Sequence, residues 1–82
     1  MEVPLQIPLD VRGSACPVPV LELARTMRRA RVGAVVVVRA DDPAAAADIA
    51  AWCESTGHCL LAVEHFGTEV TATVRKSAPP IA

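Results

Sequence analysis

The residues best suited to chemistry in this sequence are its cysteines, and Cys16 has the most informative neighbours. Cys16 precedes Pro17-Val18-Pro19 and a helical pattern, so it stands at the predicted start of a helix. A helix N-terminus offers free N–H groups and partial positive charge, and thiols placed there have pKa values lowered to roughly 3.5–7.5. We therefore expect Cys16 to be accessible and acidic, with Arg12 as a cationic neighbour and the N–H of Val18 as the chief free donor.

Two starts of this helix fit the pattern. Pro17 suits the first helical position, because the N–H that proline lacks has no intrahelical partner there. Proline also disfavours helical geometry in the residue before it, so Val18 could instead be the cap and Pro19 the first residue. A plain helix start, in which the cysteine only fills space, is the alternative interpretation of the Cys-Pro-x-Pro segment.

The other cysteines have weaker claims to chemistry. Cys53 lies on the apolar stripe of a predicted helix and Cys59 begins a predicted strand, so both are expected to be buried; a resolving role or a mutual disulfide is the alternative. A metal site that adds His58 and His65 does not follow paired-ligand spacing, so no metal is expected. A Cys-x-x-Cys redox motif is excluded because Pro19 stands three residues after the first cysteine.

Length and composition predict one domain over residues 1–82. The 8 basic and 9 acidic residues give a net charge of −1, and only Trp52 and Phe66 are aromatic, so direct nucleic-acid binding is not expected. The apolar run at 34–38 is too short to cross a bilayer, and the N-terminus lacks the pattern of a signal peptide. An odd number of cysteines also argues against a secreted disulfide framework, so a cytoplasmic location without membrane attachment is expected.

Hydrophobic periodicity predicts the order βαβαββ, with elements near residues 5–11, 17–31, 34–38, 43–55, 59–66 and 70–75. Pro8 places the first strand at a sheet edge or delays its start to Leu9. Gly33 and Gly57 are expected to end the helices. The helical crossover makes the first two strands parallel. The predicted fold is an α/β (α+β) two-layer sandwich, with two helices on one face of a four-stranded mixed sheet, a core over about 5–76 and a frayed tail at 77–82.

Charged residues near the helix ends have both structural and functional interpretations. Asp41 and Asp42 are expected to cap the second helix, ahead of proline at its first position. If both helices start at one rim of the sheet, these carboxylates lie on the edge that holds Cys16 and could contact partners. The basic cluster is either a solvated helix end or a docking patch for an acidic partner; it comprises Arg25, Arg28, Arg29 and Arg31.

The segment Leu9-Asp10-x-x-Gly13-x-x-Cys16-Pro17-x-Pro19 resembles the signature of the TusA/SirA/YedF family of small sulfur carriers. The resemblance covers about residues 9–76, and its second-helix part comprises Asp41-Asp42-Pro43-Ala44, Asp48-Ile49 and Trp52-Cys53. It implies a sulfurtransferase that carries a persulfide on Cys16 and needs no cofactor. Asp10, Gly13, Pro17 and Pro19 of this motif, together with Arg12, are the candidate positioning residues, and Leu21, Arg25, Asp41 and Asp42 are the candidate contacts for partners.

The same resemblance implies the kinds of partner. A cysteine desulfurase or a rhodanese-like protein would supply the sulfur, and an acceptor sulfurtransferase would receive it, in tRNA thiolation, molybdenum-cofactor synthesis or another sulfur-trafficking pathway. Two alternatives stay open at this point: a non-catalytic interaction or regulatory module, and a selenium- or redox-related member of the same fold.

Overall fold

The computed structural model describes residues 5–78, so the part of the predicted frayed tail at 79–82 lies outside the described residues. Its elements follow the predicted order βαβαββ. They are β1 (Gln6–Asp10), α1 (Val18–Arg29), β2 (Val35–Ala40), α2 (Ala45–Thr56), β3 (Cys59–Phe66) and β4 (Glu69–Arg75).

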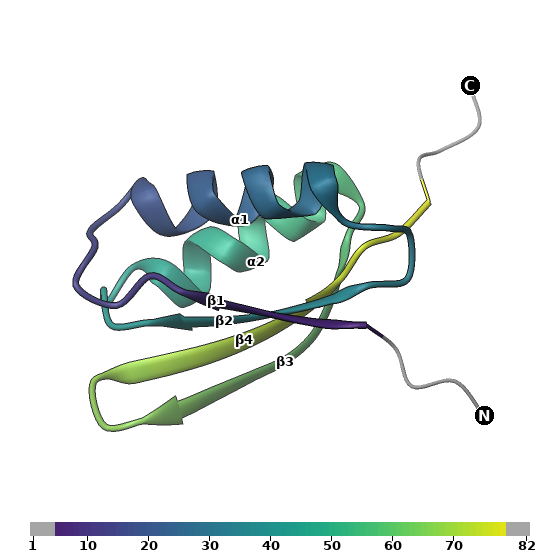
Figure 1. The fold of residues 1–82 in the computed structure, drawn as a ribbon. Helices are drawn as coiled ribbons and strands as arrows, with labels where there is room; N and C mark the ends of the chain where they lie inside the picture. Colours follow the sequence, from purple (N-terminus) through teal and green to yellow (C-terminus); the bar gives the residue numbers. More distant parts are fainter. Residues whose placement is uncertain (1–4, 79–82) are drawn as a thin grey trace.

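The strands form one mixed sheet in the order β1-β2-β4-β3, and both helices lie on the same face of it (Figure 1). β1 pairs with β2 in parallel, as expected for strands joined by a helix, whereas β4 is antiparallel to both of its neighbours. The predicted two-layer fold is thus confirmed. β1 is an edge strand that includes Pro8, which lies opposite Val37, so the edge interpretation of this proline is the right one.

The hydrophobic core lies between the helices and the sheet. Alternate residues of β2 point into it, with Val36, Val38 and Ala40 fully buried. Leu23 of α1 and Ile49 of α2 pack against this strand layer and are also inaccessible to solvent. The continuous valine run therefore forms a central strand of the sheet. Both helices pack against it in one core cluster.

The helix boundaries differ in part from the expectations. α1 begins at Val18 with Pro17 as its N-cap, one residue away from each of the two predicted starts. It ends at Arg29, before Gly33, because Ala30 is already extended and Gly33 instead occupies a left-handed position (φ 90°) in the turn before β2. Gly57 does end α2 as predicted, in the left-handed conformation typical of a C-terminal glycine.

The predicted acidic cap of α2 is wrong. α2 begins at Ala45, its N-cap residue is Ala44, and no side chain caps it. The backbone carbonyl of Asp42 accepts a hydrogen bond from the N–H of Ala45, at 3.0 Å, which closes a turn before the helix. The carboxylates of Asp41 and Asp42 are thereby left for other partners.

Within residues 5–78, no helix has the length and apolar character needed to cross a membrane.

Candidate functional site

The site lies at the rim of the sheet where the parallel strands β1 and β2 end and where α1 and α2 begin (Figure 1). Cys16 is exposed there, directly before the Pro17 cap, to which it is joined by a cis peptide bond. Cys53 is buried and Cys59 is partly buried. Cys16 is thus the most accessible of the three thiols in the protein.

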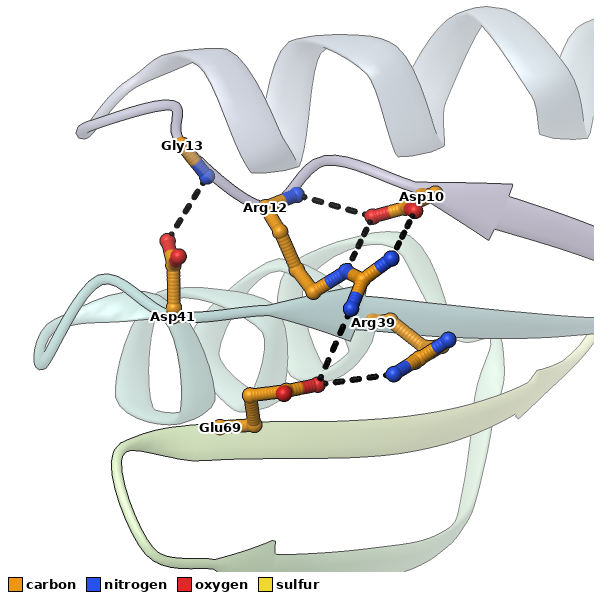
Figure 2. Close-up of polar contacts among 6 residues, drawn as sticks. All are labelled: Asp10, Arg12, Gly13, Arg39, Asp41 and Glu69. Atoms are coloured by element: carbon orange, nitrogen blue, oxygen red, sulfur yellow. Dashed lines mark hydrogen bonds and ion pairs between the residues drawn. The ribbon is translucent and has the colours of Figure 1, made fainter.

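Two aspartates of the β2–α2 loop bind the loop that carries Cys16. Asp41 accepts a hydrogen bond from the N–H of Gly13 through Oδ1, at 2.9 Å (Figure 2), and Asp42 accepts one from the N–H of Cys16 through Oδ2, at 3.2 Å. The shared rim anticipated from the parallel strands is therefore present. These carboxylates connect the two loops, a role that replaces the helix cap expected from the sequence.

The amide of Val18 does not face the sulfur as a free donor. Its N–H donates to the carbonyl of Ala15 at 2.9 Å, which closes a turn around Cys16 and Pro17. Neither Pro17 nor Pro19 has an N–H to offer. Because the nearest amides are missing or engaged, the start of α1 provides little of the hydrogen bonding that lowers thiol pKa values at other helix N-termini.

The electrostatic surroundings of Cys16 contradict the expectation of an acidic thiol. The carboxylate of Asp48 favours the protonated form of the thiol and so raises the pKa of Cys16. Desolvation and the negative charges of Asp48 and Asp42 raise the same pKa further. The free protein therefore keeps Cys16 mostly as the protonated thiol at neutral pH.

Arg12 does not supply the expected cation at Cys16. Its guanidinium binds both carboxylate oxygens of Asp10, at 2.9 and 2.7 Å, and lies 3.7 Å from Glu69, which also binds Arg39 (Figure 2). The hydrogen bonds from Arg12 hold the pKa of Asp10 well below its usual value. Asp10 and Arg12 thus stabilise the end of β1 and the start of the loop, whereas the charged groups of residues 5–78 that shift the pKa of Cys16 are the carboxylates of Asp48 and Asp42.

Replacing Asp48 by Asn tests this assignment. We expect a lower Cys16 pKa, hence more thiolate and about three- to tenfold faster alkylation by iodoacetamide near pH 7. The pH dependence of alkylation, followed by intact mass and peptide mapping, measures the change. Glu54→Gln, at the other end of α2, removes the same charge and is the control. If the Asp48→Asn profile overlays that of the unsubstituted protein, the assignment is wrong.

The surroundings of the site offer both apolar and charged surface. Val18 and Leu21 of α1 are exposed to 39% and 52%, although both are apolar, and they follow Cys16 closely in the chain. Arg25, one turn further on, pairs with Glu22 at 3.2 Å on an exposed surface. A surface pocket of about 280 Å³ lies beside the two loop aspartates, lined by Asp41, Asp42, Pro43, Ala46, His65, Gly67, Thr68 and Val70.

Cys53 and His58 have structural surroundings. Burial raises the pKa of Cys53, as does the nearby Cys59, so Cys53 is a poor nucleophile in the folded protein. His58 stacks near Trp52, with ring centroids 5.2 Å apart, and its Nδ1 accepts the N–H of Ser77. Residues 5–78 contain no cluster of three or more side chains of the kinds that bind metals.

Asp48 is the residue of the site that sequence reasoning missed. It appears in the sequence pattern of the second helix but not among the candidate site residues. A signal for it was present: it lies in the first turn of α2, and parallel strands bring the first turns of both helices to one rim. Its opposition to thiolate formation, however, depends on where its side chain points.

The fold and the site together define a small two-layer α/β domain that presents one accessible cysteine at a helix start. A family model described as "Sulfurtransferase TusA" matches residues 7–76. The chain belongs to this sulfurtransferase family.

Curated relatives carry names that agree with this family. The proposed sulfur carrier YrkF of Bacillus subtilis is 37% identical over 68 residues, which are 83% of this chain and 34% of that protein. A proposed sulfur carrier of Archaeoglobus fulgidus is 41% identical over 56 residues, 68% of this chain and 77% of the relative. A proposed sulfur carrier of Aquifex aeolicus is 36% identical over 70 residues, which are 85% of this chain and 36% of that protein. The chain thus spans about a third of the length of two of these relatives.

A solved structure agrees with the fold. The SirA-like protein of Desulfitobacterium hafniense superposes with a TM-score of 0.75, over 88% of this chain and 99% of that one, at 22% identity.

Proposed function

We propose that this protein is a persulfide carrier: Cys16 accepts a sulfur atom from a donor protein and passes it to a thiol of an acceptor. The observation that carries the proposal is the exposure of Cys16 at the start of α1, within the segment that matches the sulfurtransferase family. Cys53 is buried and Cys59 is partly buried, which makes them less accessible to a partner.

The chemistry is thiol exchange and needs no external oxidant. Cys16 loses its proton and attacks the terminal sulfur of a donor persulfide. A new S–S bond forms at Cys16 while the S–S bond of the donor breaks, and the donor leaves as a thiolate that takes up a proton. In the second step an acceptor thiolate attacks the terminal sulfur on Cys16, and Cys16 is the leaving group.

The raised pKa of Cys16 fits this sequence of steps. A thiol of higher pKa is a slower leaving group, so a persulfide on Cys16 is expected to resist transfer to chance thiols. The same pKa lowers the thiolate fraction for the first step. Docking of a partner that offsets the charges of Asp42 and Asp48 would relieve this limit.

We propose that partners dock around the sulfur through the exposed apolar residues Val18 and Leu21, with Arg25, Asp41 and Asp42 at the border of the contact. The donor would be a cysteine desulfurase or a rhodanese-like protein, and the acceptor another sulfurtransferase, in tRNA thiolation, molybdenum-cofactor synthesis or related sulfur traffic. The acceptor thiols of such a relay must stay reduced, so we propose that the protein acts in the cytoplasm.

Sulfur loading tests the proposal. Incubation with a cysteine desulfurase, cysteine and pyridoxal phosphate should add about 32 Da, one sulfur atom, to the intact mass, and a thiol reductant should remove it. A protein that stays at its original mass with an active desulfurase and with a rhodanese-like donor would contradict the carrier role. It would favour the non-catalytic module instead.

A further inference from the structure

Side chains far away in the sequence connect the loop that bears the sulfur to the loop between β2 and α2. Asp41 binds the N–H of Gly13 and Asp42 binds the N–H of Cys16, across 28 and 26 residues of sequence. Hydrogen bonds between an N–H and an ionised carboxylate are about twice as strong as neutral ones. Two such bonds connect the β1–α1 loop with the β2–α2 loop at the rim.

The bond to Cys16 is important because the motif has few other donors. Pro17 lacks an N–H, and the N–H of Val18 is already used within the turn, by Ala15. The Cys16 amide is therefore the donor through which the sulfur-bearing residue itself is held by another element. Within residues 5–78, the hydrogen-bond acceptor of the Cys16 N–H is the carboxylate of Asp42.

We propose that Asp42 is the positioning residue for Cys16 in sulfur transfer, with Asp41 fixing the Gly13 turn beside it. The inference rests on the proposed carrier function and adds a role within it. Sulfur exchange requires the attacking and accepting sulfur atoms to meet in a fixed geometry, and small displacements of a reacting group reduce rates strongly. Without the bond, the Cys16 segment would enter a docked complex in many conformations, of which few are productive.

Positioning and electrostatics at Asp42 have opposite effects on Cys16, which makes them separable. Within residues 5–78, the charged groups that shift the pKa of the thiol are Asp48 and Asp42, both negative, while Arg12 is bound to Asp10 and Glu69. Removing the charge of Asp42 should therefore increase the thiolate fraction. Removing its hydrogen bond should slow transfer, in spite of the larger amount of nucleophile.

Two substitutions of Asp42 separate these effects. Asp42→Asn loses the charge but keeps an oxygen that can accept the Cys16 N–H, whereas Asp42→Ala loses both. Sulfur loading from a cysteine desulfurase, timed by intact mass near pH 7.5, should be about tenfold slower for Asp42→Ala than for Asp42→Asn, because both variants lose the charge and only Asp42→Ala also loses the acceptor of the Cys16 N–H. Iodoacetamide alkylation should show a lower thiol pKa in both variants. Glu54→Ala is the matched control for loss of an exposed carboxylate, and thermal unfolding verifies that each variant is folded.

Each possible result decides the matter. Loading of Asp42→Ala at or above the unsubstituted rate would overturn the positioning role while leaving the carrier function intact. An equal fall in both variants would also overturn it, because the charge of Asp42 would then matter to the partner. If the unsubstituted protein does not load at all, the carrier function itself fails, and the positioning role falls with it.

Discussion

Cys16→Ser should lose the sulfur adduct completely. Serine keeps the size and polarity of the side chain but has no sulfur to form the new S–S bond, so a desulfurase that loads the unsubstituted protein should leave this variant at its original mass. The residue is exposed, and the hydrogen bond that its backbone N–H donates to Asp42 does not involve its side chain, so the fold should be unaffected. Intact mass after loading, followed by peptide mapping, measures the result.

The other two cysteines provide the controls for this experiment. Cys59→Ser removes a partly buried thiol and should load like the unsubstituted protein. Cys53→Ala removes a buried thiol from the core with little change in volume and should also load. A persulfide that persists in Cys16→Ser and maps to Cys53 or Cys59 would contradict the assignment of the carrier residue.

Most of the fold could be predicted because its determinants are local. The apolar run Val35–Val38 predicts a central strand, and the alternation of apolar and polar residues at 70–75 predicts the strand beside it. Gly57 marks a helix end, since it adopts a left-handed conformation that other residues avoid. The parallel pairing of β1 and β2 then follows from the helix between them, and so does the common rim of Cys16 and the loop aspartates.

The details that could not be predicted depend on long-range contacts. Asp42 has a side chain suited to a helix cap, but in the fold the Cys16 amide, 26 residues away, competes for the same carboxylate and binds it. Arg12 is expected near the sulfur because it is close to Cys16 in sequence, but in the fold its guanidinium pairs with the carboxylates of Asp10 and Glu69. The pKa of Cys16 depends on these long-range contacts, because the position of Cys16 before a helix does not determine which carboxylates lie around its thiol.

Exposure and charge at the site have one consequence for function. The position of Cys16 makes its sulfur accessible to partners, whereas the aspartates around it disfavour the thiolate. An accessible thiolate would also react with oxidants and unrelated electrophiles. A carrier with a protonated resting thiol would react mainly where a partner changes the local electrostatics, so Asp42 and Asp48 would limit unwanted reactions as well as shape the site.

Leu23→Ala should give a large loss of stability. Leu23 is fully buried between α1 and the sheet, in the core cluster that includes Val36 and Ile49. Truncation of a buried leucine to alanine costs about 2–5 kcal/mol, through lost transfer free energy and the cavity left behind. That is a large share of the roughly 5–15 kcal/mol that stabilises a typical small domain. Urea unfolding should show a much lower midpoint at an unchanged m-value.

Leu21→Ala is the matched control: Leu21 lies two positions earlier in the same helix but is exposed to 52%, so its truncation should change the free energy of unfolding by less than about 0.5 kcal/mol. Similar losses in the two variants would mean that the buried face of α1 is wrongly assigned, and with it the support that holds Cys16 at the rim.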